Sequence, residues 1–588
     1  MSRPRREGGG PGRPARGPAA ERGAAIKDPG GRVSVAMVWP GGYRAGMSSL
    51  GFLWCYSLVN ARPRALAERV FLPEDPGAPV RSRETGRALS SFDIVAGSLS
   101  WENDYWVFPE ILRRGGVPPE RAERGGGYRG PLVCAGGVGP WSNPWGLFPF
   151  ADVIFTGEGE IAWEAILRVS GERGFAGLPA ARRAEALAAA VPGALAPGLL
   201  PRELSEPSGP VGLARALAAF PPVAPPRLAW PFPAGAVPPR SPVWAPGAGF
   251  AGMRLVELSR GCPHGCRFCL AGQLYRPHRP WGADAVVEAV SAPNPWSGED
   301  PFPAGAPAGL VSAAAADHPE FEGIVERLAG AGRRVSFSSL RLSALTERAA
   351  RLLGAGGLRG AAVAPEGGAD ALRRRINKNL DEPAILEGAR ILRAAGLRTL
   401  KLYFMFGLPG ETDGDLEAAA SLAARIGREV RGRGAGPAVA ASFCCFVPKP
   451  HTPFEDEPLL PEGETRRRAG LLERLFRRAG GVALRVEPPR ASLVQGVISQ
   501  GGPEAYGLVR ALLATGGRQG PALRLAGVGE GHPLFRARDP AEARPWRVIA
   551  PPAGREHLGR EALLAAEGAE SPPCPAGNGC GRCRACDP

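Results

Sequence analysis

The chain has 588 residues, a formal net charge of +15 and eleven cysteines. Its length exceeds that of one ordinary domain and predicts about two to four domains. No run of about 18 apolar residues is present, so we expect no membrane-spanning helix. The first 30 residues also lack the apolar core of a signal peptide. These features favour a cytoplasmic protein, in which clustered cysteines indicate metal ligands rather than disulfides.

Residues 1–31 are rich in Gly, Pro and Arg and are predicted to form a disordered basic tail. The positive charge of the whole chain makes RNA a candidate partner. The alternative is a basic surface with no polyanionic partner, because no Lys/Arg stripe with interleaved aromatic residues stands out.

Residues 32–170 show the alternation of strands and helices that is typical of a doubly wound, Rossmann-like domain. Short apolar runs that end in Gly or Ser predict buried parallel strands, at 32–39, 92–99, 131–137 and 151–157. Helices are expected from Trp101 to the Gly115–Gly116 pair and from Glu158 onward. Residues 171–250 are rich in Ala and Pro and are interpreted as a linker with one helix and a small strand pair.

A second alternating region, residues 251–461, contains six apolar runs separated by helical patterns that end in Gly. The runs lie at 253–259, 308–314, 334–340, 360–365, 398–407 and 438–446. They predict a partial (β/α)6 barrel, whose catalytic loops follow the C-terminal ends of the strands. Residues 462–570 are expected to form a mainly helical extension, followed by a Cys-rich tail at 571–588.

Cys262, Cys266 and Cys269 follow the first predicted barrel strand with the spacing C-x3-C-x2-C. Three thiolates can hold three irons of a [4Fe–4S] cluster and leave the fourth iron open, whereas four cysteines would close the site. Structural zinc is the first alternative and would need His264 as a fourth ligand, which is difficult inside so short a loop. The second alternative, an electron carrier, would normally have a fourth cysteine nearby.

At these residues the chain resembles the radical S-adenosylmethionine (SAM) enzymes, whose signature has an aromatic residue before the third cysteine, here Phe268. The resemblance implies that SAM chelates the open iron through its amino and carboxylate groups. An electron from a donor such as flavodoxin or ferredoxin then cleaves SAM to methionine and a 5′-deoxyadenosyl radical, which abstracts hydrogen from a substrate. The segments RGCPHGCRFCLAGQLYRPHRP, KLYFMFGLPGETDGDL and FDIVAGSLSWENDYW are similar to the branch that carries an N-terminal B12-binding-like domain.

Four residues at or just past the predicted strand ends are candidates to bind SAM. Glu366 ends the fourth strand and could accept hydrogen bonds from a ribose diol or the SAM ammonium group. Asn377 and Lys378 follow, and the charge of Lys378 could meet the SAM carboxylate. Gly407 ends the fifth strand, where a glycine lets the backbone approach a ligand closely. For each, the alternative role is a solvated rim residue or a local turn.

Related enzymes carry a Gly-Gly-Glu-type motif after the second strand that binds the SAM amino group, and this chain departs from that pattern. Ser312 or Asp317 could take its place. Lys449 and His451 lie just past the sixth strand and are candidates to contact substrate, with rim solvation as the alternative.

The six histidines of the chain all lie at or after position 264, so the first domain has no Asp-x-His-x-x-Gly motif and no axial imidazole for cobalamin. Cobalamin would bind there without a protein imidazole, or the domain has the fold alone and serves as a scaffold. Glycines at the predicted strand ends would leave room for a nucleotide-like tail at the sheet edge: Gly97, Gly136, Gly137 and Gly157.

Cys574, Cys580, Cys583 and Cys586 form a second cluster near the C-terminus. Four thiolates on a Gly-rich turn can close around zinc or an auxiliary iron–sulfur cluster, and Arg582 and Arg584 would favour the thiolates electrostatically. The alternative is a tail that binds no metal.

The sequence therefore predicts a radical SAM enzyme that cleaves SAM and modifies an unknown substrate, with methyl or methylthio transfer and an RNA substrate as candidates. A competing hypothesis is a non-catalytic RNA-binding or assembly protein with structural metal sites.

Overall fold

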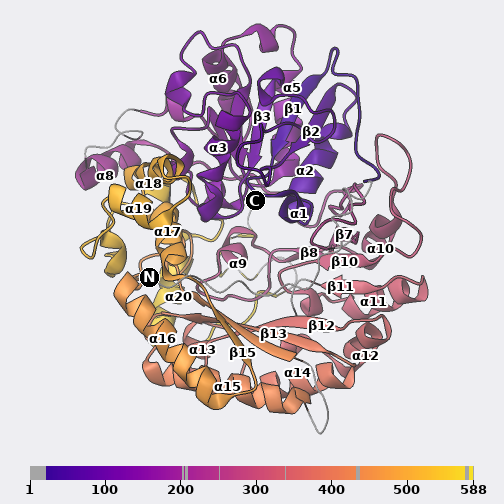
Figure 1. Cartoon of the computed structure of the whole chain (residues 1–588), viewed down its shortest axis with the longest axis vertical. Coiled ribbons are helices and arrows are strands. Elements are labelled where there is room, and N and C mark those ends of the chain that lie inside the picture. The colour runs from indigo at the N-terminus through magenta and orange to yellow at the C-terminus, as the bar shows by residue number, and fades with distance from the viewer. Residues whose placement is uncertain are drawn as a thin grey trace.

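The computed structural model describes residues 21–586 apart from 202–203, 205–208, 251, 338–339, 432–437, 576–579, 581 and 584 (Figure 1). Of the tail predicted to be disordered, residues 1–20 lie outside the described residues. Residues 21–31 are instead part of the fold: Arg22 exchanges backbone hydrogen bonds with Trp244, and the N–H of the buried Ala25 donates to the hydroxyl of Tyr56 over 2.7 Å. None of the described helices is both long enough and apolar enough to span a bilayer.

The first domain is built on a six-stranded sheet in the order β2-β1-β3-β4-β5-β6, of which only β6 is antiparallel to its neighbour. Its strands are β1 (Val33–Val38), β2 (Ala65–Val70), β3 (Ile94–Ser98), β4 (Leu132–Gly136), β5 (Val153–Phe155) and β6 (Ala194–Leu195). The order 2-1-3-4-5 is that of a flavodoxin-like doubly wound sheet, in which ligands bind beyond the carboxyl ends of the strands where the order reverses. The four strands predicted for this region are confirmed, and so is the doubly wound fold.

Helices cover both faces of this sheet. The six helices of the domain are α1 (Tyr43–Gly46), α2 (Leu50–Asn60), α3 (Val107–Arg114), α4 (Val138–Ser142), α5 (Gly159–Ser170) and α6 (Ala180–Ala190). Side chains of α2, α5 and α6 share one apolar core with the sheet, and those of α3 and α4 share another. Because α6 and β6 belong to this domain, it extends past residue 170 into the predicted linker, which also contains α8 (Gly209–Ala219).

The second domain is a partial (β/α)6 barrel with one extra strand, and its six predicted strands are all confirmed. They are β7 (Arg254–Glu257), β10 (Ala308–Val311), β11 (Val335–Phe337), β12 (Gly360–Glu366), β13 (Thr399–Phe406) and β14 (Ala438–Cys445), followed by β15 (Ala483–Val486). They run parallel in the orders β11-β10-β7 and β12-β13-β14-β15. A hydrogen bond from the N–H of Leu340 to the carbonyl of Ala362, 3.0 Å long, connects the two groups of strands.

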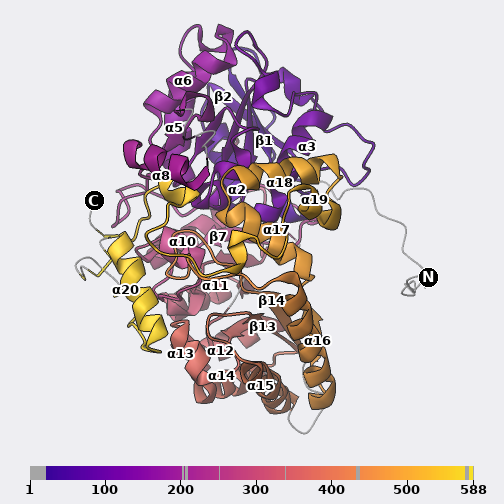
Figure 2. The ribbon, with the colours of Figure 1, turned by 90° about the vertical axis from the view of Figure 1, so that its left-hand side faces the viewer.

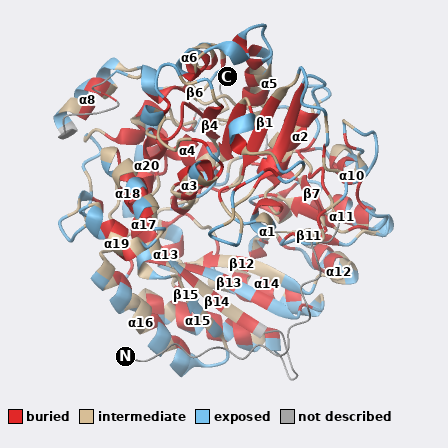
Figure 3. Cartoon of the chain, turned by 45° about the horizontal axis from the view of Figure 1, so that its top comes forward, coloured by how far each residue is buried: buried red, intermediate tan, exposed pale blue. Residues whose placement is uncertain are grey.

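Amphipathic helices pack on the outside of the barrel strands. They are α10 (Ala283–Ser291), α11 (Phe321–Gly330), α12 (Glu347–Ala355), α14 (Glu382–Ala394), α15 (Asp413–Arg431) and α16 (Glu462–Ala479). In β13 buried and exposed residues alternate, so that one face packs against helices while Tyr403 on the other face is 43% exposed. Figure 3 shows the strands of the first sheet almost wholly buried, whereas α15 and α16 keep exposed outer surfaces.

The C-terminal helices join the two domains. They are α17 (Pro489–Gln500), α18 (Pro503–Ala514), α19 (Gln519–Leu525) and α20 (Arg555–Ala566). Helix α18 contacts α3 of the first domain, α17 contacts residues 102–104 of the same domain, and α19 packs on α17 and α18. Helix α20 packs on the short barrel helix α13 (Asp370–Arg375) (Figures 1 and 2). The predicted helical extension is therefore present, and it contacts both the first domain and the barrel.

Candidate active site

The three-cysteine loop lies between β8 (Ser259–Arg260) and α9 (Leu270–Leu274), at the C-terminal end of β7. Gly261 begins the loop with φ +78°, and a Cβ there would lie 2.3 Å from the carbonyl oxygen of Tyr275, so the position requires glycine. At the other end the thiol of Cys269 accepts the N–H of Gly272 over 3.3 Å and thereby caps α9. The turn of the chain and its cap therefore fix the direction in which the loop projects.

Arg267 anchors the middle of the loop to the barrel. Its side chain is fully buried, its guanidinium pairs with Glu561 of α20 over 3.1 Å, and it donates to the carbonyl of Arg375 over 2.9 Å. Its own N–H donates to the carbonyl of Ile376 over 3.0 Å. The loop is thus rigid at the residue between Cys266 and Cys269, as a cluster-ligating loop needs to be.

The three thiols lie close enough to one another to interact electrostatically. Burial, followed by repulsion from the Cys266 and Cys269 thiolates, raises the pKa of Cys262 to about 12. Burial and the Cys266 thiolate likewise raise the pKa of Cys269 to about 11. Three thiolates so close are unfavourable unless positive charge lies among them, and the irons of a cluster supply that charge. The donor set therefore fits a [4Fe–4S] cluster.

His264 does not complete a zinc site with these cysteines. Its Nε2 lies 2.8 Å from Oδ1 of Asp317, which turns the ring toward the loop after β10. Among the described residues no group of three or more His, Cys, Asp or Glu side chains is placed to hold a single metal ion. A cubane imposes no such geometry, since each thiolate binds a different iron.

Glu366 and Lys378 form an ion pair beside the loop, with Nζ 3.2 Å from Oε1. Burial lowers the pKa of Lys378, but the charges of Glu366 and Cys266 outweigh it, and the net shift is upward. Glu366 lies at a register irregularity of β12 and has φ +68°, a conformation that a non-glycine residue adopts at some energetic cost. The pair therefore brings both charges to the cluster loop, where the sequence predicted them.

Three other predicted cofactor contacts have roles within the fold. Asn377 donates to the carbonyl of Gly265 over 3.1 Å and accepts the N–H of Ser571 over 2.8 Å, so its amide ties the loop to the C-terminal tail. Phe268 packs in a small apolar cluster that includes Met405 of β13. Gly407 has φ +81°, a left-handed backbone conformation that a residue with a Cβ adopts only with strain. Contact of these residues with SAM stays a prediction.

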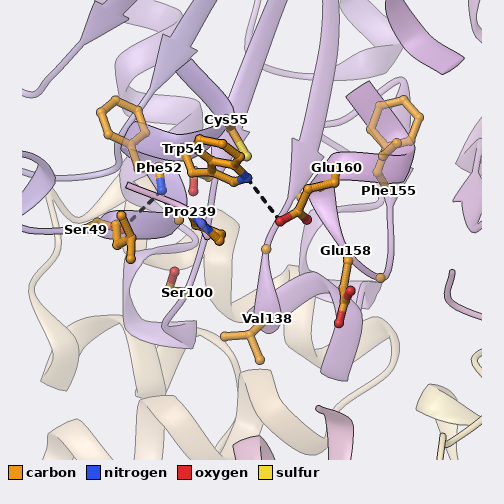
Figure 4. A pocket seen from close by; sticks show the side chains of 18 of the residues that line it. Ser49, Phe52, Trp54, Cys55, Ser100, Val138, Phe155, Glu158, Glu160 and Pro239 are labelled. Carbon is orange, nitrogen blue, oxygen red and sulfur yellow. Dashed lines mark hydrogen bonds between the residues drawn. The ribbon is translucent and has the colours of Figure 1, made fainter. Parts of the chain in front are cut away.

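A cavity of about 400 Å³ lies between the first domain and the barrel (Figure 4). Its first-domain wall includes all four glycines that the sequence placed at the sheet edge, namely Gly97, Gly136, Gly137 and Gly157. Its barrel wall includes Gly261, Ser312 and Tyr275. The size is that of a cofactor site, and the cavity lies beyond the carboxyl ends of both sets of strands. A molecule bound at the first sheet therefore faces the cluster loop.

Ser312 stands at the end of β10, where its hydroxyl lies 2.7 Å from that of Ser259 and accepts the N–H of Ala314. It thus lies where the missing Gly-Gly-Glu-type motif would act. The other candidate for that role, Asp317, faces His264 instead.

A buried ion-pair network closes the cavity between the domains. Arg260 of the barrel lies 2.9 Å from Glu158, 2.7 Å from Glu160 and 3.0 Å from Glu257. Arg279 pairs with Glu158 as well. Burial would raise the pKa of Glu158, but Arg260 and Arg279 overcome this and lower it. These residues were not predicted from the sequence as site residues, although the GEGE segment after β5 was a signal for them.

Replacing Arg260 with methionine is expected to lower the free energy of unfolding by about 3–5 kcal/mol, because it leaves buried carboxylates uncompensated. Urea denaturation measures the change. The control is Arg390→Met on the exposed face of α14, whose surface ion pairs should contribute little. Equal stabilities of the two variants would contradict the structural importance of the network.

Trp54 and Cys55 bring helix α2 to the cavity. The indole Nε1 of Trp54 donates to Glu160 over 3.1 Å, and Figure 4 shows both side chains beside the cavity. The wall of the first domain is therefore aromatic and apolar near α2 and carboxylate-rich near α5.

Lys449 and His451, predicted to contact substrate, both contact the first domain. Nζ of Lys449 donates to Glu102 over 2.6 Å. His451 is 1% exposed, and its Nε2 lies 3.0 Å from the carbonyl of Ser142, which can only accept. A side chain so buried does not face a substrate, so this arrangement does not support the prediction for His451. Lys449 remains 15% exposed.

Asp104 lies near this junction and gives it a pH dependence. Burial and the Glu102 carboxylate raise the pKa of Asp104 from 3.8 to about 7. Its contribution to stability is therefore full below pH 3.8 and is lost as the pH rises toward 7. Asp104→Asn should raise the free energy of unfolding at pH 8 by on the order of 1 kcal/mol and flatten its decline between pH 4 and pH 7. Urea denaturation at several pH values checks this, and unchanged pH curves would contradict it.

The segment of the four C-terminal cysteines contacts the cluster loop through Cys574. The N–H of Cys574 donates to the carbonyl of Pro263 over 2.6 Å, and Cys583 is 3% exposed. Zinc or cluster ligation by these residues stays a prediction at this point.

Comparison with known families agrees with this division of the chain. The family model "Radical SAM proteins, N-terminal" matches residues 51–197, and "Radical SAM superfamily" matches residues 256–423. A curated relative, the uncharacterised protein MJ0966 of Methanocaldococcus jannaschii, is 28% identical over 247 residues, or 42% of this chain. The match covers 52% of that protein, so the chain spans about half the length of this relative.

Two solved structures are similar at lower identity. TsrM of Kitasatospora setae, a radical SAM methyltransferase with cobalamin and a [4Fe–4S] cluster bound, is 14% identical, with 74% of this chain and 75% of that chain covered and a TM-score of 0.44. OxsB, a cobalamin-dependent SAM radical enzyme, is 12% identical, with coverages of 67% and 52% and a TM-score of 0.39. Both likenesses are too distant to carry an argument about function.

The barrel and its loop define an α/β protein in which three thiols lie together on the loop that follows the first barrel strand. The second family model spans that barrel from β7 to α15, including the three cysteines, Glu366 and Lys378. The first model covers most of the doubly wound domain. The chain is therefore a radical SAM protein.

Proposed function

We propose that this protein is a radical SAM enzyme that holds a [4Fe–4S] cluster on Cys262, Cys266 and Cys269 and cobalamin in the cavity between its domains, and that it transfers a methyl group to its substrate. When bound, the cluster supplies the electron that cleaves SAM, and cobalamin supplies a methyl carrier. Methylthio transfer, an RNA substrate and a flavodoxin or ferredoxin donor stay predictions.

One observation carries the proposal: a single cavity joins the sheet edge of the first domain to the cluster loop. Gly136 and Gly157 line it from one side, and Gly261, next to Cys262, lines it from the other. A cofactor on the sheet and a cofactor on the loop would thus meet without intervening backbone. No histidine precedes residue 264, so cobalamin would bind here without an imidazole from the first domain.

The residues of the chain would bind and orient SAM and exclude water. Lys378 offers its ammonium group to the SAM carboxylate, and Glu366 offers oxygens to a ribose or ammonium donor. The hydroxyl of Ser312 lies on the cavity wall, where it could contact the amino group. The apolar wall formed by Phe52, Phe155 and their neighbours keeps water from a reactive intermediate.

Anaerobic reconstitution with iron, sulfide and cobalamin, followed by reduction with SAM present, tests the proposal. We expect formation of 5′-deoxyadenosine or S-adenosylhomocysteine, and stoichiometric cobalamin seen by its visible absorption. A purified protein that holds only zinc and turns over no SAM would instead support a non-catalytic binding or assembly protein. SAM cleavage without cobalamin binding would leave the radical enzyme and overturn the methyl-transfer part.

A further inference from the structure

The C-terminal tail is hydrogen-bonded to the cluster loop. The N–H of Cys574 donates to Pro263, the residue after Cys262, over 2.6 Å. Three residues earlier, the N–H of Ser571 donates to Asn377 over 2.8 Å, and its carbonyl accepts from Asn379 over 3.0 Å. The first cysteine of the tail therefore has a fixed place beside the loop.

The later cysteines are held by other parts of the chain. Cys583 is buried with Ala553, Leu558 and Ala585, and its carbonyl accepts the N–H of Gly554 over 3.1 Å. Arg227 of the segment between the domains donates to the carbonyl of Ala585 over 3.2 Å. The described parts of the tail are thus anchored at both ends of the cysteine motif.

A second cavity, of about 460 Å³, lies between the tail and the cluster loop. Cys574 and Cys580 line it from the tail, and Gly265 lines it from the loop. His557 of α20 lines it too. Its side chain is buried at 6% exposure, and its Nε2 has no hydrogen-bond partner among the described residues. An unpartnered ring nitrogen in a polar cavity indicates a ligand that is not protein.

Positive charge surrounds the same cavity. Arg276, Arg560 and Arg582 line it, and Nη1 of Arg276 lies 3.8 Å from the thiol of Cys583. Glu561 also lines the cavity, but its carboxylate is paired with Arg267 over 3.1 Å. Arginines in such positions stabilise thiolates and any anionic group that thiolates ligate. The chemistry of the cavity therefore matches a net-negative guest bound by sulfur.

The geometry points to a second iron–sulfur cluster, ligated by Cys574, Cys580, Cys583 and Cys586, with His557 as a hydrogen-bond donor toward it. Cys580-x2-Cys583-x2-Cys586 is the spacing with which ferredoxin-type chains hold a [4Fe–4S] cluster, and Cys574 supplies the fourth thiolate. Because four cysteines close this site, it has no open iron for SAM. This proposal does not depend on methyl transfer or on cobalamin.

A cluster fits this site better than zinc does. Among the described side chains, no three potential ligands converge on one point, as tetrahedral zinc requires. Around a cavity of this volume, thiolates can instead bind separate irons of a cubane.

Metal content of the full-length chain, reconstituted anaerobically, tests this inference. We expect about eight irons and eight sulfides per chain, with zinc absent. The double variant Cys580→Ala/Cys583→Ala should lose about half of the iron, and Cys262→Ala/Cys266→Ala/Cys269→Ala should lose the other half. Cys55→Ala and Cys444→Ala, at cysteines outside both sites, should lose none.

Because the two variants change different cysteine sets, the metal content stays informative even if one variant misfolds. If the tail variant fails to fold, the loop variant still reports the tail site, because its remaining iron should show the EPR signal of a reduced [4Fe–4S] cluster. About four irons in the unmodified chain, with or without one zinc, would overturn the inference. So would a loop variant that holds no iron. Failure of SAM cleavage with about eight irons present would count against the proposed reaction alone.

Discussion

Replacing Cys266 with alanine should abolish SAM cleavage, with a loss of at least about a thousandfold, or about 4 kcal/mol of barrier height. Cys266 is one of three thiolates available to the cluster in the loop, and the Lys378–Glu366 pair lies beside it. Without it the cluster loses one iron–thiolate bond and the site that SAM would occupy. The measurement is 5′-deoxyadenosine formed per chain after anaerobic reduction, together with the iron content.

Cys444→Ala is the matched control for this experiment. Cys444 lies on β14, its side chain is exposed, and it belongs to neither cysteine cluster. We expect this variant to retain cleavage and iron. The prediction fails if Cys266→Ala keeps cleavage within about tenfold of the unmodified protein, since the loop would then not be the seat of the cluster. Thermal unfolding of both variants shows whether a loss of activity reflects loss of the fold.

Much of the fold could be predicted because most strands of the barrel and of the first sheet are short, largely apolar runs. Strand β2 was missed because it carries Glu68 and Arg69 in its centre. Both are buried: Arg69 pairs with Glu84 over 2.6 Å, and Glu68 accepts the hydroxyl of Thr85 over 2.6 Å. A buried charge is compensated by partners elsewhere in the chain, and a local pattern of apolar residues contains no information about them.

The cysteine loop and the positions of Glu366 and Lys378 at the barrel rim were predictable because spacing and strand ends determine them locally, but the ion pair between the two residues was not predicted. The surroundings of His451 could not be predicted, because its partner, Ser142, lies 309 residues away in a domain whose docking the sequence did not reveal. The cavity between the domains could not be predicted from the sequence for the same reason. Its glycines could be identified one by one at strand ends, but the wall that faces them belongs to the barrel.

Gly136→Leu should abolish cobalamin binding without unfolding the protein. Gly136 ends β4, and its φ lies outside the left-handed region, so a side chain there adds no backbone strain. The nearest atom to a Cβ would be the carbonyl oxygen of Phe155 at 3.5 Å, which is ordinary contact. A leucine would therefore extend into the cavity at the sheet edge and occupy the space of a ligand. We expect bound cobalamin, measured by visible absorption, to fall at least about tenfold, with the free energy of unfolding within about 1 kcal/mol of the unmodified protein.

Gly126→Leu separates this effect from the general effect of adding a leucine. Gly126 is exposed on a turn of the same domain, a Cβ there would meet nothing within 4 Å, and its φ is likewise outside the left-handed region. This variant should bind cobalamin as the unmodified protein does. Iron content should be normal in both variants, because the cluster loop is unchanged. If Gly136→Leu binds cobalamin stoichiometrically, the cofactor does not sit at the carboxyl ends of the first sheet. Cobalamin would then not occupy the space that the leucine fills. The cavity would instead hold SAM or substrate.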